Sequence, residues 1–167
     1  MITINHYGDK FFVFDAKDVE RLRCEYRIVG AFSGTLPQYP LQNTFYGLPL
    51  LLLPEEVSLI THNGWGNVVS KKKPMSPSPN EIFNDLWSKG FYITSGIKFG
   101  GDYLLYTNDP MCTHSEFIIG VRQEEEDIKP VEIISMGRLA TNVKKTFVVA
   151  GSIQEMMTYY SIEWAGF

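Results

Sequence analysis

The chain has 167 residues, of which 44% are hydrophobic and 20% charged, and its formal net charge is −4. This size and composition predict a globular protein with one domain or two small ones, and no apolar run is long enough to span a bilayer. The acidic charge argues against an independent nucleic-acid binder, because contacts with phosphate dominate such affinity. The two cysteines, Cys24 and Cys112, are too few for a disulfide framework or a metal cluster, so we expect a reducing intracellular compartment.

Residues 1–69 predict a small mixed α+β module. Two short apolar stretches, residues 2–7 and 10–14, flank Gly8-Asp9 and predict a hairpin. Asp15 stands where a helix N-cap belongs. The helix after it has an apolar face formed by residues at i, i+3 and i+7, with Gly30 as its predicted stop: Val19, Leu22 and Tyr26.

The rest of this module is less regular. The run from Ser33 to Pro49 is rich in turn formers and predicts an irregular connection. The apolar run 48–53, which contains Pro49 and ends before Pro54, is interpreted as buried core. Pro54, followed by two glutamates, predicts the start of a second helix that ends near Gly64.

Residues 70–79, with the sequence SKKKPMSPSP, predict the boundary between the module 1–69 and a second domain, 80–167. Lysine, proline and serine in a row favour an extended, solvated linker over a packed segment. The Lys71–Lys73 run leaves two other functions open, a weak nuclear-import signal or a contact with RNA phosphate.

Residues 80–167 predict an α/β domain with a central mixed sheet flanked by helices. Ser78 and Glu81 have capping-box spacing, and they predict a helix that ends at Gly90. A second helix is predicted over 131–144 from apolar residues at helical spacing. β-rich runs predict five strands, at 91–94, 103–106, 116–121, 147–150 and 158–164. Strands and helices in this order predict a sheet with helices packed on it.

Three residues of the second domain form a candidate reaction centre. Tyr106 ends a strand, His114 follows eight residues later, and Lys145 lies between the second helix and the next strand. Sites collect at strand ends and in the loops that follow them. These side chains suit cleavage of RNA by its own 2′-hydroxyl, in which a base removes the 2′-proton, an acid protonates the leaving 5′-oxygen and a cation stabilises the phosphate. The residues alone do not bring the three groups together.

The run YITSGIKFGGDYLLYTNDPMCTHSEF, followed by RLATNVKKTFVVA, resembles the catalytic core of the tRNA-splicing endonuclease family. The run VFDAKDVERLRCEYRIVGAFSGTLPQYPLQNTFYGLPLLLLPEE resembles one branch of that family, the eukaryotic catalytic subunit assigned to the 3′ splice site. The resemblance covers nearly the whole chain, from about Phe11 to Trp164.

The resemblance implies the roles of the three residues. Tyr106 is then the base, His114 of HSEF the acid, and Lys145 of VKKT the group that stabilises the phosphorane, with Lys144 as the alternative lysine. It implies cleavage of precursor tRNA at the 3′ splice site, with a 2′,3′-cyclic phosphate and a 5′-hydroxyl as products. No cofactor and no metal ion are expected.

RNA-binding residues are also implied. Arg138 and Trp164 match the family's arginine and aromatic pair, which grips a flipped base by cation–π stacking and serves a site on another subunit. The alternative is that Trp164 packs in the core and Arg138 pairs with an acid. Lys98 is either a phosphate contact or a solvated lysine. Three glycines before the Tyr106 strand are expected to form tight turns: Gly96, Gly100 and Gly101.

The resemblance further implies a four-subunit assembly of two catalytic and two structural subunits. This chain would pair tightly with a structural subunit by strand addition through its apolar tail, YYSIEWAGF. A connecting loop is predicted at 151–157; it carries only Glu155, which fits an acceptor of a partner's acidic loop rather than a donor. The acidic run Glu124–Asp127 has no assigned role. We expect a nuclear protein, with the mitochondrial surface as the alternative known among fungal members.

Two other functions compete with this one. The first is a catalytically silent scaffold of the same assembly, and the complete tyrosine, histidine and lysine set argues against it. The second is a free-standing ribonuclease, and the acidic net charge and the apolar tail argue against that.

Overall fold

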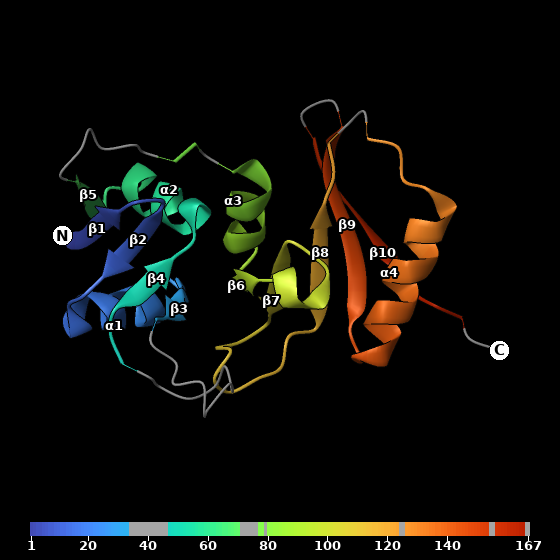
Figure 1. Cartoon of the computed structure of the whole chain (residues 1–167), viewed down its shortest axis with the longest axis horizontal. Helices are drawn as coiled ribbons and strands as arrows, with labels where there is room; N and C mark the ends of the chain where they lie inside the picture. Colours follow the sequence, from blue (N-terminus) through green and yellow to red (C-terminus); the bar gives the residue numbers. More distant parts are fainter. Residues whose placement is uncertain (34–46, 71–76, 79, 124–125, 154–155, 166–167) are drawn as a thin grey trace. The chain divides into compact units, whose positions relative to one another are not determined.

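The computed structural model describes residues 1–33, 47–70, 77–78, 80–123, 126–153 and 156–165. The chain forms two compact units, Met1–Asn84 and Asp85–Phe167, and the described strands of each form one five-stranded sheet (Figure 1). The division falls within helix α3 (Glu81–Ser88). Most of the predicted linker, with Lys71–Lys73, lies outside the described residues. Within the described ranges no helix has both the length and the apolar character needed to cross a membrane.

The N-terminal unit begins with the predicted hairpin, in which β1 (Ile2–Tyr7) pairs antiparallel with β2 (Lys10–Val13). Helix α1 (Ala16–Cys24) begins at Asp15, whose side chain accepts hydrogen bonds from the backbone of the first turn. The predicted stop at Gly30 is wrong. The helix ends at Cys24, because the chain turns at Arg27, which has a left-handed φ of 54°, and the Ile28 N–H bonds back to Leu22.

The N-terminal sheet has the strand order β3-β4-β2-β1-β5. The sequence did not predict three of its short strands: β3 (Ala31–Phe32), β4 (Leu50–Leu52) and β5 (Gly66–Ser70). Leu50 and Leu52 of β4 are buried, as expected for the apolar run 48–53. Helix α2 (Pro54–His62) starts as predicted and is followed by Gly64 with a φ of 70°. Most of the connection before β4, residues 34–46, lies outside the described residues.

The C-terminal sheet has the order β10-β9-β8-β7-β6. Its strands are β6 (Tyr92–Ser95), β7 (Tyr103–Tyr106), β8 (Phe117–Val121), β9 (Thr146–Ile153) and β10 (Met156–Ile162). The pair β8–β9 is parallel and the other pairs are antiparallel, so the sheet is mixed, as predicted. Helix α4 (Pro130–Asn142) joins β8 to β9 and packs against β9 and β10 (Figure 1).

Two local predictions for this half are wrong. The expected loop at 151–157 is mostly strand, since β9 runs on to Ile153 and β10 starts at Met156, with these two residues paired; Glu155 lies outside the described residues. The cap of α3 is Asn80 rather than Ser78, because the Asn80 side chain accepts a hydrogen bond of 2.9 Å from the Phe83 N–H.

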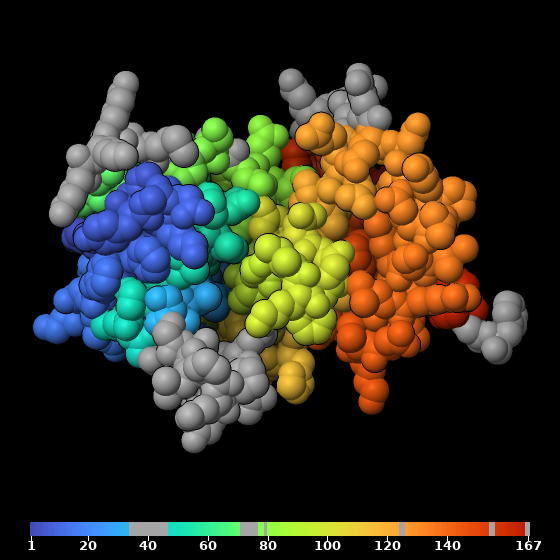
Figure 2. All heavy atoms as spheres, in the orientation of Figure 1, coloured from blue at the N-terminus to red at the C-terminus, as the bar shows by residue number. Residues whose placement is uncertain are grey.

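The core of the C-terminal unit lies between the sheet and α4. Its buried cluster draws on β7, β8, α4 and β9: Leu104, Tyr106, Ile118, Ala140, Phe147 and Val149. Phe99 of the short 3₁₀ helix η1 (Ile97–Phe99) packs against the same cluster. In Figure 2 the yellow atoms of the η1 region lie on the surface of this unit. The candidate tyrosine therefore belongs to the packed face that α4 covers.

Candidate active site

Tyr106 ends the buried strand β7 and is itself only 7% exposed. Its hydroxyl lies 3.5 Å from the Thr94 hydroxyl of the neighbouring strand β6. Its ring packs in the cluster with Ala140 of α4 and Phe147 of β9. Packing on the ring and a polar neighbour at the hydroxyl hold this side chain in one orientation, which a positioned base requires.

His114 lies in the loop that joins β7 to β8, and its side chain is exposed. The loop has its own internal bonds. The Asp109 side chain accepts from the Met111 N–H at 2.7 Å, and the Asp109 carbonyl accepts from the N–H groups of Cys112 and Thr113. These bonds form a compact turn that ends one residue before His114. The loop therefore presents an exposed imidazole on an ordered support.

Lys145 follows the C-terminus of α4 and immediately precedes β9. Its ammonium donates a hydrogen bond of 2.6 Å to the carbonyl of Ser115, a buried residue next to His114. The same ammonium lies 5.5 Å from the centre of the Phe99 ring. Burial lowers the pKa of the Lys145 ammonium. Of the two candidate lysines, Lys145 contacts the histidine loop, while Lys144 is exposed and adopts a left-handed φ of 55°.

The strand register explains how residues from distant parts of the sequence meet. Leu105, Phe117 and Thr146 are paired across β7, β8 and β9. The next position along each strand toward the histidine loop is occupied by Tyr106, Glu116 and Lys145. The Glu116 N–H bonds to the Leu105 carbonyl at 3.1 Å, and the Thr146 N–H bonds to the Glu116 carbonyl at 3.0 Å.

This row fixes the spacing of the candidate groups. Adjacent strands are about 4.8 Å apart, so the backbones of Tyr106 and Lys145 are about 10 Å apart, with Glu116 between them. Both side chains lie on the α4 face, because Tyr106 belongs to the core cluster and Lys145 lies over Phe99, which packs on that cluster. His114 precedes the middle residue of the row by two positions. The predicted residues thus gather at one end of the sheet, on three neighbouring segments.

Arg138 and Trp164 form a group of their own. The Arg138 guanidinium lies 4.9 Å from the centre of the Trp164 ring, within the range of a cation–π interaction. Trp164 is 39% exposed, so one side of the pair is open to solvent. The structure therefore places these two side chains together, and Trp164 is not a fully buried core residue. Lys98 lies in η1 and is exposed.

The glycines before β7 serve the packing of the turn, as predicted. Gly100 has a φ of 70°, which favours glycine. A Cβ at Gly101 would lie 2.6 Å from the Ile118 side chain and 2.7 Å from the Ile119 carbonyl, so a side chain there would force the strand away. These positions fit the role of tight turn geometry.

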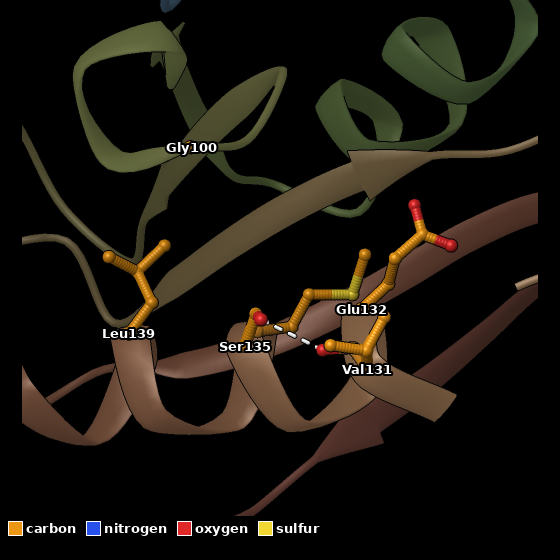
Figure 3. A pocket seen from close by; sticks show the side chains of 6 residues that line it. Gly100, Val131, Glu132, Ser135 and Leu139 are labelled. Atoms are coloured by element: carbon orange, nitrogen blue, oxygen red, sulfur yellow. Dashed lines mark hydrogen bonds between the residues drawn. The ribbon is translucent and has the colours of Figure 1, made fainter. Parts of the chain in front are cut away.

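A shallow groove of about 230 Å³ lies beside this turn. It runs along one side of α4, where the Ser135 hydroxyl bonds to the Val131 carbonyl at 2.8 Å (Figure 3). Its lining is mostly apolar: Gly100, Val131, Glu132, Ser135, Met136 and Leu139. None of the predicted catalytic residues lines it, so the candidate site is an open sheet end and not this groove.

Two further residues of the candidate site, Glu116 and Thr107, were not predicted from the sequence. The Thr107 hydroxyl donates a hydrogen bond of 2.8 Å to the Glu116 carboxylate, and this bond joins the first residue after Tyr106 to the middle residue of the row. The only local signal was a charged residue directly before an apolar strand. Its position between Tyr106 and Lys145 depends on the strand register, which no local pattern encodes.

Comparisons with known proteins agree with this architecture. Residues 2–71 match the model of the TSEN34-like, N-terminal domain, and residues 80–160 match that of the tRNA intron endonuclease, catalytic C-terminal domain. The second match includes Tyr106, His114 and Lys145; Trp164 lies beyond it.

Relatives from archaea, yeast and human are similar to the chain. A tRNA-splicing endonuclease of Saccharolobus solfataricus is 31% identical over 160 aligned positions, covering 76% of this chain and 88% of that protein. The probable tRNA-splicing endonuclease subunit sen34 of Schizosaccharomyces pombe is 25% identical over 276 aligned positions, covering 98% of this chain and 97% of the relative. The human tRNA-splicing endonuclease subunit Sen34 is 35% identical over 85 residues, covering 50% of this chain and 27% of the human protein.

The fold and the comparisons together define a two-domain enzyme with a tRNA intron endonuclease catalytic domain. The chain belongs to the tRNA-splicing endonuclease family, and its N-terminal domain is of the TSEN34-like type.

Proposed function

We propose that this chain is the catalytic subunit that cleaves precursor tRNA at the 3′ splice site. The observation that carries the proposal is the bond of 2.6 Å between the Lys145 ammonium and the Ser115 carbonyl, because it joins the candidate cation to the loop of the candidate acid. The match of the N-terminal domain to the TSEN34-like type supports the choice of the 3′ site.

The reaction assigns one role to each side chain. Tyr106 accepts the proton of the 2′-hydroxyl while the 2′-oxygen bonds to phosphorus. Lys145 stabilises the charge that develops on the phosphorus-bound oxygens. His114 donates a proton to the 5′-oxygen as the bond between phosphorus and that oxygen breaks. The products are a 2′,3′-cyclic phosphate and a 5′-hydroxyl. One proton passes to Tyr106 and one leaves His114, and exchange with solvent water restores both groups before the next cut.

The different exposures of His114 and Tyr106 are consistent with these roles. His114 is exposed, so it can reach a leaving oxygen on a large RNA, whereas Tyr106 is held in the core and offers only a small part of its surface. Attack by the 2′-oxygen needs this fixed geometry, because the reacting atoms must be aligned before they react.

The proposal also covers the residues that bind RNA and the pairing of this chain with other subunits. The Arg138–Trp164 pair grips a base for a site on another subunit, and the exposed Lys98 contacts phosphate. The chain works as a subunit, paired through β10 and the residues after it with a structural subunit, and joined to a second pair. Exposed apolar residues of β10, such as Met156 and Tyr160, support such pairing. The nucleus is the proposed compartment, with the mitochondrial surface as the fungal alternative.

The proposal is tested with a precursor tRNA that has a 2′-deoxynucleotide on the 5′ side of the 3′ splice-site bond. Without the attacking hydroxyl, the assembled enzyme should leave the 3′ splice site uncut and still cut the 5′ site. The unmodified precursor is the control, and its 3′-site products should have cyclic-phosphate and 5′-hydroxyl ends. Cleavage of the deoxy precursor at the 3′ site would contradict the proposed chemistry.

A further inference from the structure

Glu116 occupies the centre of the proposed site without a role in the chemistry. Its N–H bonds to the carbonyl before Tyr106, and its carbonyl accepts from the N–H after Lys145. Its carboxylate accepts from the hydroxyl of Thr107. One residue thus bonds to the neighbours of both Tyr106 and Lys145, and it lies two positions from His114.

The side-chain bond closes the histidine loop. Thr107 is the first residue after β7 and Glu116 the last before β8, so the bond of 2.8 Å between them ties the two ends of the loop together. Inside the loop, the Thr113 hydroxyl lies 3.3 Å from both the Asn108 and Asp109 carbonyls. The Lys145 ammonium holds the loop at Ser115, the residue between His114 and Glu116. The position of His114 is therefore set from both ends.

A negative charge at this point is costly for an enzyme that binds RNA. The Glu116 side chain is exposed and belongs to the row that contains Tyr106 and Lys145. An exposed carboxylate repels phosphate, while an exposed side-chain hydrogen bond adds little to the stability of a fold. Neither phosphate binding nor stability explains the hydrogen bond between Thr107 and Glu116, whereas a histidine loop held in place for the acid does.

We propose that Glu116, through its hydrogen bond from Thr107, is the positioning residue that aligns His114 with the leaving 5′-oxygen. This inference rests on the proposed function. It assigns the carboxylate as the acceptor of a hydrogen bond from the Thr107 hydroxyl, so an acceptor oxygen is needed at this position and the negative charge is not.

The test measures single-turnover cleavage and precursor binding by the assembled enzyme. Glu116→Ala should slow the 3′ cut about tenfold, because His114 is then less well aligned with the leaving oxygen. The affinity for precursor tRNA should be unchanged or higher, because a carboxylate that repels phosphate is removed. Glu116→Gln keeps an acceptor oxygen and should cut within about twofold of the unaltered enzyme. Thr107→Val should be as slow as Glu116→Ala, and the double variant no slower than either, because all three lack the same bond.

Controls separate the possible failures. Glu20→Ala removes an exposed carboxylate of α1 and should leave the 3′ cut unchanged. Thr107→Ser keeps the hydroxyl and should cut at the unaltered rate. This result would show that the slow cut of Thr107→Val comes from the lost hydrogen bond and not from a folding defect. A Glu116→Ala enzyme that cuts at the unaltered rate would overturn the inference, and so would a Glu116→Gln enzyme as slow as Glu116→Ala. If His114→Ala also cuts normally, the proposed function fails as well; if His114→Ala is inactive, only the positioning role fails.

Discussion

The ammonium of Lys145 and the main-chain carbonyl of Ser115 are 2.6 Å apart, which joins the end of α4 to the loop that carries His114. The two residues are 30 positions apart in the sequence, and only the parallel pairing of β8 with β9 brings them together. In the proposed mechanism, the charge that stabilises the phosphate is therefore held in place before RNA binds.

Replacing Lys145 by methionine should remove this charge with little change in volume. We expect the rate of the 3′ cut to fall by about 10² to 10³-fold, as for other groups that stabilise a developing oxyanion. Single-turnover cleavage of precursor tRNA measures the effect. Lys144→Met is the matched control, because that side chain is exposed, and an equal loss in the two variants would contradict the choice of Lys145.

The pH dependence of the 3′ cut should reflect the same lysine. Burial lowers the pKa of Lys145, so its ammonium loses its proton at a lower pH than an ordinary lysine and the rate should decline there as pH rises. In Lys145→Arg the charge persists, because a guanidinium is not deprotonated in proteins. The alkaline decline should then disappear from a rate profile measured with precursor tRNA. An unchanged decline in the arginine variant would assign it to another group.

The aromatic ring of Trp164 should contribute to RNA cleavage by stacking on a base. Trp164→Ala removes the ring that lies 4.9 Å from the Arg138 guanidinium, whereas Trp164→Phe keeps an aromatic face. If the pair grips a base for a site on another subunit, the alanine variant should slow the 5′ cut about tenfold or more and the phenylalanine variant much less. The two cuts are followed separately on a gel. Equal effects of both variants would indicate a packing role instead.

Tyr159 of β10 ties the edge strand to α3. Its hydroxyl donates a hydrogen bond to the Asp85 carboxylate, which Lys89 also pairs with. Tyr159→Phe should lower the free energy of unfolding by about 1–2 kcal/mol, since a charge-assisted bond is lost. Tyr160→Phe is the control, because Tyr160 is 59% exposed. Urea unfolding of the full chain compares the two variants, and an equal effect would contradict the account.

Glu56 should make the N-terminal unit sensitive to pH. Its carboxylate is 1% exposed and accepts hydrogen bonds from the N–H groups of Gly30 and Leu53. Burial raises the pKa of Glu56 to about 7, against the lowering effect of these bonds. The folded state then binds this proton more tightly than the unfolded state, so stability should fall as pH rises from about 4.5 to about 7, by on the order of 3 kcal/mol.

Hydrogen exchange of the α2 amides as a function of pH measures this effect within the N-terminal unit. Glu56→Gln has no titrating group and should lose the pH dependence in this window. It should also be less stable, since the amide offers one acceptor oxygen where the carboxylate offers two. Glu20→Gln should behave like the unaltered chain, because Glu20 is exposed. A Glu56→Gln chain with the original pH dependence would contradict this assignment.

Local signals in the sequence predicted the elements that depend on neighbouring residues. The hairpin at Gly8-Asp9, the Asp15 cap and the start of α2 at Pro54 were all found from residues within a few positions. Strands β3, β4 and β5 were not predicted, because they are only 2, 3 and 5 residues long. They form by pairing with distant strands, and a single stretch of sequence carries no signal of its partner.

The candidate site also contains some residues that the sequence predicted and others that depend on the strand register. Tyr106, His114 and Lys145 were each found from their place near a strand end and from the family resemblance. Glu116 was not, because its position between Tyr106 and Lys145 follows from the register of three strands. The pairing of Arg138 with Trp164 was expected from the family resemblance alone, because the contact depends on how the chain after β10 lies along α4.

Intron excision by the assembled enzyme with His114→Ala in this subunit, with each cut resolved on a gel, decides whether this chain makes the 3′ cut. We expect the 3′ cut to slow by about 10² to 10⁴-fold, with the 5′ cut retained. Loss of the 5′ cut alone would assign the chain to the other splice site. Undisturbed cutting at both sites would contradict the account, since the Tyr106, His114 and Lys145 group would then have no part in the reaction.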